Sequence, residues 1–392
     1  MLVGIVGAPN KGKSTLFSAL TSIDVQIADY PFTTIKPNMG VAYVTKRCAD
    51  TELHVKCNPK NSMCADGIRM IPVKLIDVAG LVEGAHSGRG MGNQFLSDIA
   101  AADALIIVAD ASGKTDTNGN PCSGCDPAKD VSVIIDEMVA WLAGIISSHS
   151  KELSRSKDGA KALAAVLAGL RITEAQISDS IAKCNLPSSG ISWDESETLR
   201  FSRELLSRSK PFLVAANKSD VHGSASNTEK LKAAFGPERV IACSAAVELA
   251  LRKAERQGII SYNAGSGTVK VTKAGIPREQ ADALNYMTKF VEEHGTGVQQ
   301  IIDRIYFDIL DNIVVYPVED ENRYTDSMGN VLPDAILLKR GSTALDLASA
   351  IHTDLANGML YAIDARKKMR IAKDRVLNDN DVIKIVSSAK PK

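Results

Sequence analysis

The clearest chemical pattern of the sequence lies at the beginning of the chain. A short apolar run leads into Gly7-x4-Gly12-Lys13-Ser14, and an amphipathic helical pattern follows directly. In such a loop, glycines let backbone N–H groups face phosphate oxygens, and the helix N-terminus adds partial positive charge. Lys13 is expected to reach the β- and γ-phosphates, and the Ser14 hydroxyl to bind Mg²⁺. The pattern predicts a phosphate-binding loop formed by Gly7, Asn10, Lys11, Gly12, Lys13, Ser14 and Thr15.

Two later motifs supply the remaining groups for a metal–phosphate site. A proline-containing loop at 29–38 carries two threonines, and we expect the hydroxyl of Thr34, with Thr33 as the close alternative, to join the Mg²⁺ shell while a γ-phosphate is present. At the end of a predicted strand, Asp77 offers a carboxylate to Mg²⁺ and Gly80 a backbone N–H to the γ-phosphate. Together with Lys13, we expect Thr34 and Gly80 to act on the reacting phosphate. Leu81 cannot orient water, so slow intrinsic hydrolysis is expected.

The base-binding groups are predicted about a hundred residues after the strand at 104–110. The strand at 211–216 ends in Asn217-Lys218-x-Asp220, and the next strand is followed by Ser244, Ala245 and Ala246. The Asp220 carboxylate can accept hydrogen bonds from guanine N1–H and its amino group, whereas adenine offers neither. Asn217 and Lys218 are expected to brace the base and the phosphate loop, and a backbone N–H of the Ser244–Ala246 loop is expected to meet the guanine O6. This arrangement predicts GTP and GDP as ligands.

Composition limits the possible partners and locations. The 392 residues suffice for two or three domains, and 46 basic residues balance 46 acidic ones, so no field of the whole chain attracts nucleic acid. We expect neither a signal peptide nor a membrane span, and therefore a soluble, cytoplasmic protein without membrane contact. Seven cysteines in a chain of this size favour reduced thiols over a disulfide framework.

The other segments predict a helical insertion and a small C-terminal domain. Helical apolar spacing recurs at 131–148, 158–184 and 195–207, and short strands are predicted at 314–318, 335–339, 360–364 and 381–387 around a helix at 344–355. Two strands, a helix and further strands make a β-grasp. Four basic residues near its end favour a phosphate backbone, although such runs are often a solvated turn: Arg366, Lys367, Lys368 and Arg370.

These motifs carry a family resemblance. The strings Pro31-Phe32-Thr33-Thr34 and Asp77-Val78-Ala79-Gly80-Leu81 resemble the Obg superfamily of P-loop GTPases, in particular its YchF-like branch. Pro333-Asp334-Ala335 and Gly341-Ser342-Thr343 resemble the TGS domain. Many YchF proteins lack the guanine motif and prefer ATP, whereas Asn217, Lys218 and Asp220 are intact here. The resemblance therefore points to the guanine-specific archaeal and eukaryotic subgroup.

The resemblance implies an α/β fold, a three-layer GTPase domain with an inserted helical arm and a C-terminal TGS domain. The expected domains are residues 1–127 and 208–311 for the GTPase with a helical extension, 128–207 for a coiled-coil-like arm, and 312–389 for TGS. The function expected is GTP hydrolysis in a ribosome-associated or translation switch, with ribosome or RNA contacts through the arm and TGS. An ATPase of the YchF kind and an RNA-binding scaffold with incidental hydrolysis remain alternatives.

Three further questions remain open from the sequence. Asn10, combined with Leu81, predicts a K⁺ ion between the phosphates, against the alternative that Asn10 only hydrogen-bonds its own turn. His86 and Arg89 lie in a glycine-rich segment as either catalytic aids or solvated residues. A zinc knuckle or a set of free thiols is compatible with Cys48, His54, Cys57 and Cys64.

Overall fold

The computed structural model describes residues 1–21, 38–78, 98–263, 265, 267–273 and 275–388. The chain divides into two compact units. The first unit comprises Met1–Ser22, Lys36–Gly40 and Lys74–Ile301, and the second comprises Ile23–Ile35, Val41–Val73 and Ile302–Lys392.

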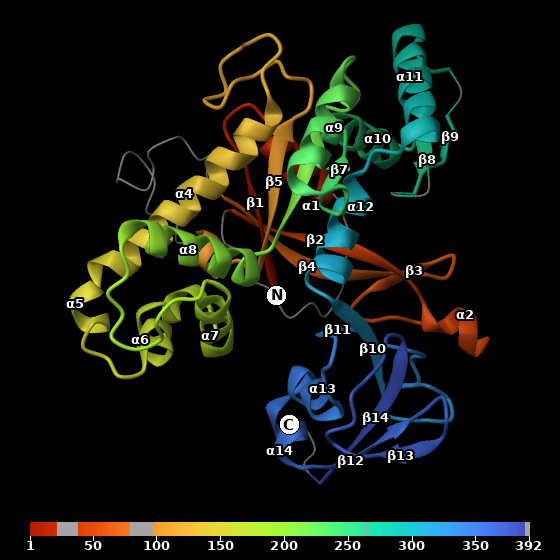
Figure 1. Cartoon of the computed structure of the whole chain (residues 1–392). Helices are drawn as coiled ribbons and strands as arrows, with labels where there is room; N and C mark the ends of the chain where they lie inside the picture. Colours follow the sequence, from red (N-terminus) through yellow and green to blue (C-terminus); the bar gives the residue numbers. More distant parts are fainter. Residues whose placement is uncertain (22–37, 79–97, 264, 266, 274, 389–392) are drawn as a thin grey trace. The chain divides into compact units, whose positions relative to one another are not determined.

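Parallel pairing of the end of β4 with β1, and of β1, β5, β6 and β7 in turn, forms the centre of the first unit (Figure 1). Strand β1 pairs in parallel with β4 on one side and β5 on the other, and β6 and β7 continue the order β2-β4-β1-β5-β6-β7. All seven residues of β5 are buried, as expected for an apolar strand covered on both faces. The strands are β1 (Leu2–Val6), β2 (Met39–Arg47), β4 (Ile68–Asp77), β5 (Ala104–Asp110), β6 (Phe212–Asn217) and β7 (Val240–Ala242).

The parallel arrangement decides where the predicted chemistry lies. Because parallel strands end at the same edge, the turn after β1, Asp77 of β4, Asp110 of β5 and Asn217 of β6 come to one edge of the sheet. Helices α1 (Lys13–Thr21), α9 (Ser224–Phe235) and α10 (Ala245–Arg256) follow β1, β6 and β7. The predicted strands and helices of this region are confirmed.

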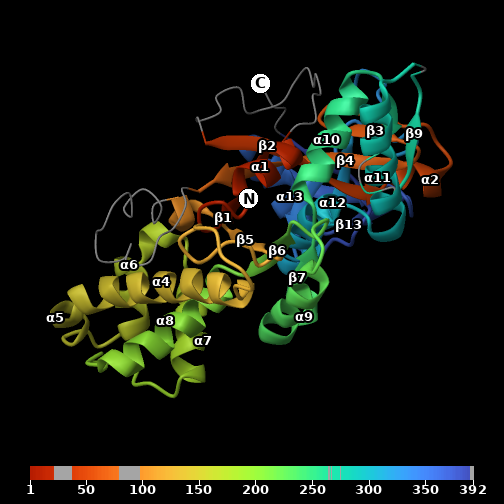
Figure 2. The same ribbon diagram turned by 90° about the horizontal axis from the view of Figure 1, so that it is seen from above.

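The inserted segment is helical but differs from a coiled coil. Helices α4 and α8 lie side by side in both ribbon views (Figures 1 and 2), while the helices between them have only four to ten residues. Buried side chains of the insertion share one hydrophobic core with the sheet, because its apolar faces turn toward β5 and β6. The insertion therefore belongs to the first unit. Its helices are α4 (Pro127–Ser148), α5 (Ser150–Leu153), α6 (Gly159–Val166), α7 (Glu174–Lys183) and α8 (Glu195–Ser209).

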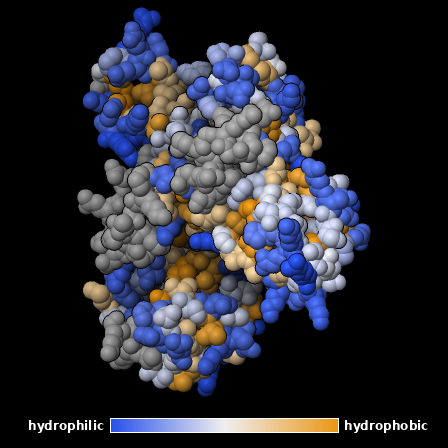
Figure 3. All heavy atoms as spheres, turned by 90° about the vertical axis from the view of Figure 1, so that its left-hand side faces the viewer, coloured by the Kyte–Doolittle hydropathy of each residue, from blue (hydrophilic) through white to orange (hydrophobic). Residues whose placement is uncertain are grey.

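Helix α4 is long and apolar enough to cross a membrane by length and composition alone. Its apolar side chains are instead part of the core, among them Val131, Ile134, Met138 and Leu142. The face drawn in Figure 3 shows hydrophilic residues along much of its rim and hydrophobic residues nearer its middle. Core packing explains the composition of α4 without a membrane.

A hairpin and two helices complete the first unit, and the sequence predicted the helices but not the hairpin. Strands β8 (Ile260–Tyr262) and β9 (Val269–Val271) pack with α10 and α11 (Arg278–His294) around a small core of their own. The two helices match the sequence prediction. The three-residue strands are too short to show a period of two.

The second unit contains the predicted β-grasp. Its five-stranded sheet has the order β11-β10-β14-β12-β13, and α13 packs on it after an N-cap at Thr343. The Thr343 hydroxyl accepts from the Asp346 N–H at 3.2 Å, as capping residues do. The elements are β10 (Asn312–Val318), β11 (Ile336–Lys339), α13 (Ala344–Ile351), α14 (Thr353–Asn357), β12 (Met359–Asp364), β13 (Met369–Ile371) and β14 (Asp381–Ser387).

Residues 41–73 group with the β-grasp rather than with residues 1–127 as predicted. This part contains most of β2 and β4, helix α2 (Ala49–Leu53) and strand β3 (Met63–Ala65). Arg69 Nη2 donates to the Leu332 carbonyl at 2.7 Å, and the Thr45 N–H donates to Asp303 Oδ1 at 2.6 Å. These polar contacts between distant parts of the sequence, of which that of Arg69 is buried, explain the different boundary.

Candidate nucleotide-binding site

The loop between β1 and α1 has the backbone geometry of the predicted phosphate loop. Gly12 adopts φ +89°, and a Cβ there would lie 2.2 Å from Asn217 Nδ2. Asn10 also has a positive φ, 62°, which asparagine tolerates better than most residues. Glycine is thus required at position 12 both by conformation and by the close approach of Asn217.

Lys13 and Asp77 lie together at the end of β4. Lys13 Nζ is 3.0 Å from Asp77 Oδ1 and donates to the Val78 carbonyl at 2.6 Å. Ser14 is exposed in the first turn of α1. The hydroxyl and the carboxylate are hard oxygen donors of the kind Mg²⁺ prefers. Bound Mg²⁺ would neutralise charge on the phosphates, with Ser14 and Asp77 holding it and Lys13 turning to the phosphate.

The side chain of Lys11, a residue of the predicted phosphate loop, is bound within the protein. This side chain is fully buried, with Nζ 2.7 Å from Asp130 Oδ2 and donating to Thr115 Oγ1 at 3.0 Å. Burial raises the pKa of Asp130, although the hydrogen bond from Lys11 opposes the shift. The ammonium group of Lys11 therefore fastens the loop to α4, and only its backbone remains a candidate for phosphate contact.

Asn217 joins the base motif to the phosphate loop. Its Nδ2 donates to the Lys11 carbonyl at 3.0 Å, and its Oδ1 accepts from the Ala245 N–H at 3.1 Å. Lys218 Nζ donates to the Asn10 carbonyl at 2.9 Å and lies 2.8 Å from Asp110 Oδ2. One motif thus braces three segments that are far apart in the sequence.

The Asp220 carboxylate is oriented by the loop after β7. Ser244, fully buried, donates from Oγ to Asp220 Oδ1 at 2.6 Å. Ser244 also caps α10, since its Oγ accepts from the Val247 N–H at 3.3 Å. Ala245 and Ala246 begin that helix. The predicted base-recognition residues are therefore brought together at one end of the sheet.

Several predicted residues lie outside the described part of the chain. These are Thr34, Gly80, Leu81, His86 and Arg89.

Sequence reasoning missed the segment after β5. Asn10 Nδ2 donates to the Gly119 carbonyl at 2.9 Å, and Thr115 accepts from Lys11. Burial opposes ionisation of Asp110, but hydrogen bonds from Lys218, Ser112 and Thr115 outweigh it and lower its pKa. The signal available was Asp110 itself, a carboxylate at the end of a fully apolar strand.

The structure also bears on the cysteines and on the basic residues of the β-grasp. Cys122 and Cys125 form a disulfide, so not all seven thiols are reduced. Of the four basic residues of the β-grasp, Arg366 has Nη1 2.7 Å from Glu52 Oε2, and Arg370 stacks 3.8 Å from the Tyr361 ring centroid. The side chains of Lys367, Lys368 and Arg370 are exposed, so the expected contact with a phosphate backbone stays a prediction.

Three family models match the chain. They are described as a 50S ribosome-binding GTPase over residues 2–137, an Obg-like GTPase YGR210-like, G4 motif-containing domain over 215–320, and a TGS domain over 328–387. The GTPase model covers the phosphate-binding motifs before the helical insertion, and the G4 model covers the base-binding motifs after it.

A GTP-binding protein of Methanocaldococcus jannaschii is 49% identical over 99% of this chain and 100% of its own. The chain belongs to the YchF-like branch of the Obg family of P-loop nucleotide hydrolases. A crystal structure of a GTP-binding protein from Pyrococcus horikoshii matches this Obg-like protein with a TM-score of 0.79 and 37% identity, covering 99% and 100% of the two chains. The ribosome-binding ATPase YchF of Mycoplasma genitalium is 35% identical over 55% of this chain and 56% of its own.

Proposed function

We propose that this Obg-like protein binds GTP with Mg²⁺ and hydrolyses it to GDP and phosphate. The observation that carries the choice of base is the Asp220 carboxylate, held by Ser244 at 2.6 Å. An oriented carboxylate matches the two donors of guanine, and adenine would leave it facing an acceptor. The names of relatives do not decide between guanine and adenine, since one relative is called a GTP-binding protein and another an ATPase.

Competition between GTP and ATP for the purified protein tests the proposal. We expect GTP to bind at least about a hundredfold more tightly, because a buried polar group without its partner costs about 1–3 kcal/mol per hydrogen bond. Asp220→Asn should remove this preference, and Ser244→Ala should reduce it without removing it. Equal affinities in the unchanged protein would contradict guanine specificity and favour the ATPase alternative.

We place the catalytic work on a small set of groups. Lys13 would stabilise charge on the β- and γ-phosphates once nucleotide displaces its contact with Asp77. Thr34 and Gly80 are proposed to bind Mg²⁺ and the γ-phosphate, respectively. With Leu81 in place of glutamine, a monovalent cation near Asn10 is proposed to supply further positive charge. Asn10 donates its amide to Gly119, which leaves the side-chain oxygen to serve as the ligand.

We further propose that the partner is the ribosome. The description of the matched GTPase model and the name of the Mycoplasma relative support this partner. Sedimentation with ribosomes in GTP and in GDP measures it. Replacing the basic residues Arg366, Lys367, Lys368 and Arg370 by glutamine should lower the slope of log affinity against log salt by about one per phosphate contact. An unchanged slope would exclude this cluster from RNA binding.

A further inference from the structure

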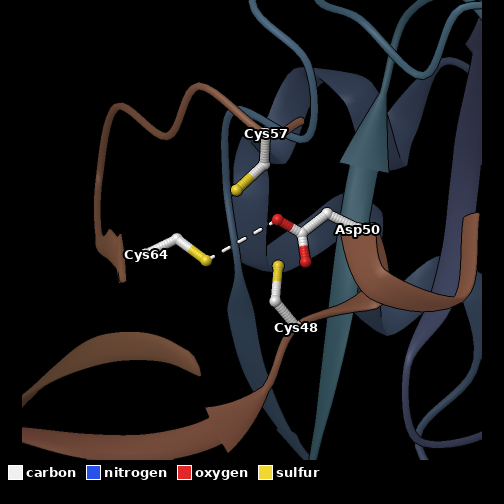
Figure 4. Close-up of side chains that lie close together, drawn as sticks. All are labelled: Cys48, Asp50, Cys57 and Cys64. Carbon is white, nitrogen blue, oxygen red and sulfur yellow. Dashed lines mark hydrogen bonds between the residues drawn. The ribbon is translucent and has the colours of Figure 1, made fainter. Parts of the chain in front are cut away.

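Three thiols and one carboxylate converge in the second unit (Figure 4). Cys48 immediately precedes α2, Asp50 lies on that helix, Cys57 follows it in a loop, and Cys64 lies on β3. The Sγ atoms and a carboxylate oxygen all lie within 4.8 Å of one another. The four side chains point toward a common centre.

The spacing fits a single tetrahedral ion. With Zn–S bonds of about 2.3 Å and a Zn–O bond of about 2.0 Å, a tetrahedron separates a sulfur from an oxygen ligand by about 3.5 Å. Cys64 Sγ and Asp50 Oδ2 are 3.7 Å apart. In an iron–sulfur cubane each cysteine binds a different iron, which spreads the sulfurs more widely.

The Asp50 carboxylate supplies an independent observation. Asp50 is only 8% exposed; Cys64 Sγ donates to its Oδ2 at 3.7 Å, while its buried Oδ1 makes no hydrogen bond of regular geometry among the described residues and has only the neighbouring Cys48 and Cys57 thiols as weak donors. A buried carboxylate oxygen without a partner is costly, and native structures seldom contain one without an unseen ion or water. The carboxylate is directed among the three sulfurs (Figure 4), so an ion there would satisfy it.

The surroundings are also electrostatically suited to a cation with thiolate ligands. Three thiolates and a carboxylate whose ligand atoms lie within 4.8 Å of one another would repel each other without a cation between them. Arg69, fully buried beside the cluster, and a divalent ion would together offset three of the four ligand charges.

We propose that Cys48, Asp50, Cys57 and Cys64 bind one Zn²⁺ ion. Four protein ligands leave no open position, which makes the site structural, and binding releases the thiol protons to solvent. The ion would close the short segment from α2 to β3 on itself. His54, considered with these cysteines from the sequence, is exposed at the left-handed C-cap of α2 and is not a ligand.

The metal content of the full-length protein tests the site directly. Protein produced with zinc and purified under reducing conditions should contain one zinc per chain after gel filtration. A mercurial that modifies thiols should release it to a colorimetric chelator. Replacement by Co²⁺ should give the sulfur-to-cobalt charge-transfer band and the intense visible bands of a tetrahedral thiolate site. Reduced protein that holds no zinc and gives no such spectrum would overturn the proposal.

Single substitutions locate the ion. Cys64→Ala should abolish stoichiometric zinc, and Asp50→Asn should weaken binding by more than the roughly 10–100-fold typical of losing an outer-shell partner. Cys184→Ser, at a buried free cysteine of the first unit, is the matched control and should retain one zinc. Loss of zinc from the control, or unchanged affinity in Asp50→Asn, would contradict this ligand set. A disulfide among the three cysteines in freshly reduced, zinc-supplied protein would also contradict it.

Discussion

The nucleotide-binding edge and the cysteine cluster are both rich in polar groups, but they are held together differently. At the edge, Lys11, Asn217 and Lys218 each have protein partners, and the loop keeps its shape through contacts with residues more than a hundred positions away. In the cluster, Asp50 and the thiols have mainly one another. The first region is organised before its ligand binds, whereas the second requires a ligand to be complete. Unsatisfied buried groups are thus a better indication of a missing ion than the mere presence of suitable side chains.

The largest effect expected is on the buried ion pair that fastens the phosphate loop. Asp130→Ala removes the carboxylate 2.7 Å from Lys11 and leaves a buried ammonium group. We expect a loss of about 3–5 kcal/mol in the free energy of unfolding, with weaker GTP binding. Urea denaturation measures the first and nucleotide titration the second.

The matched control lies on the same helix. Asp136 forms an ion pair with Arg203 in which both side chains are more than half exposed. Asp136→Ala should cost less than about 1 kcal/mol, because solvent screens the pair. Equal effects of the two substitutions would mean that the phosphate loop is not organised by its own buried contacts.

Removal of zinc should have the next largest effect and should be confined to the second unit. Zinc that binds only the folded state at a free concentration a hundredfold above its Kd adds about 2.7 kcal/mol of stability. Calorimetry of zinc-loaded and chelated protein should therefore show a lower unfolding temperature after chelation. GTP affinity should stay within about twofold, since no proposed zinc ligand belongs to the first unit. A large loss of GTP affinity would break the distinction between the two sites.

The smallest effect concerns Asn10 and the proposed K⁺ ion. Hydrolysis should be slower in NaCl than in KCl, and Asn10→Gly should reduce the difference while preserving the positive φ of 62°. One lost ligand corresponds to about 0.5–1.5 kcal/mol, or roughly two- to tenfold in rate. Asn10→Ala adds backbone strain and should also weaken GTP binding. Identical rates in the two salts, with and without ribosomes, would leave Asn10 only its hydrogen bond to Gly119.

Much of the site could be predicted because its residues form contiguous motifs at the ends of apolar strands. Gly12, Lys13 and Asn217 could be placed from strand order alone, since parallel topology brings their segments to one edge. The role of Lys11 could not be predicted, because nothing local indicates that Asp130, in the first turn of α4, approaches it. Asp50 was missed for a similar reason, as an aspartate near cysteines is usually a surface residue. The grouping of residues 41–73 with the second unit could not be predicted either. It involves tertiary contacts of the buried Arg69, and an arginine is usually expected at the surface.

Asn217 has a consequence for how the two halves of a nucleotide are recognised. Its side-chain amide contacts both the phosphate loop and the start of α10, and it lies so close to position 12 that only glycine fits there. A shift of this amide on binding of the base changes the affinity of the loop for phosphates. Binding of phosphates changes the affinity for the base by the same factor, because linkage between binding sites is reciprocal. Selectivity for the base and affinity for the triphosphate are therefore coupled, and a substitution that weakens one should also weaken the other.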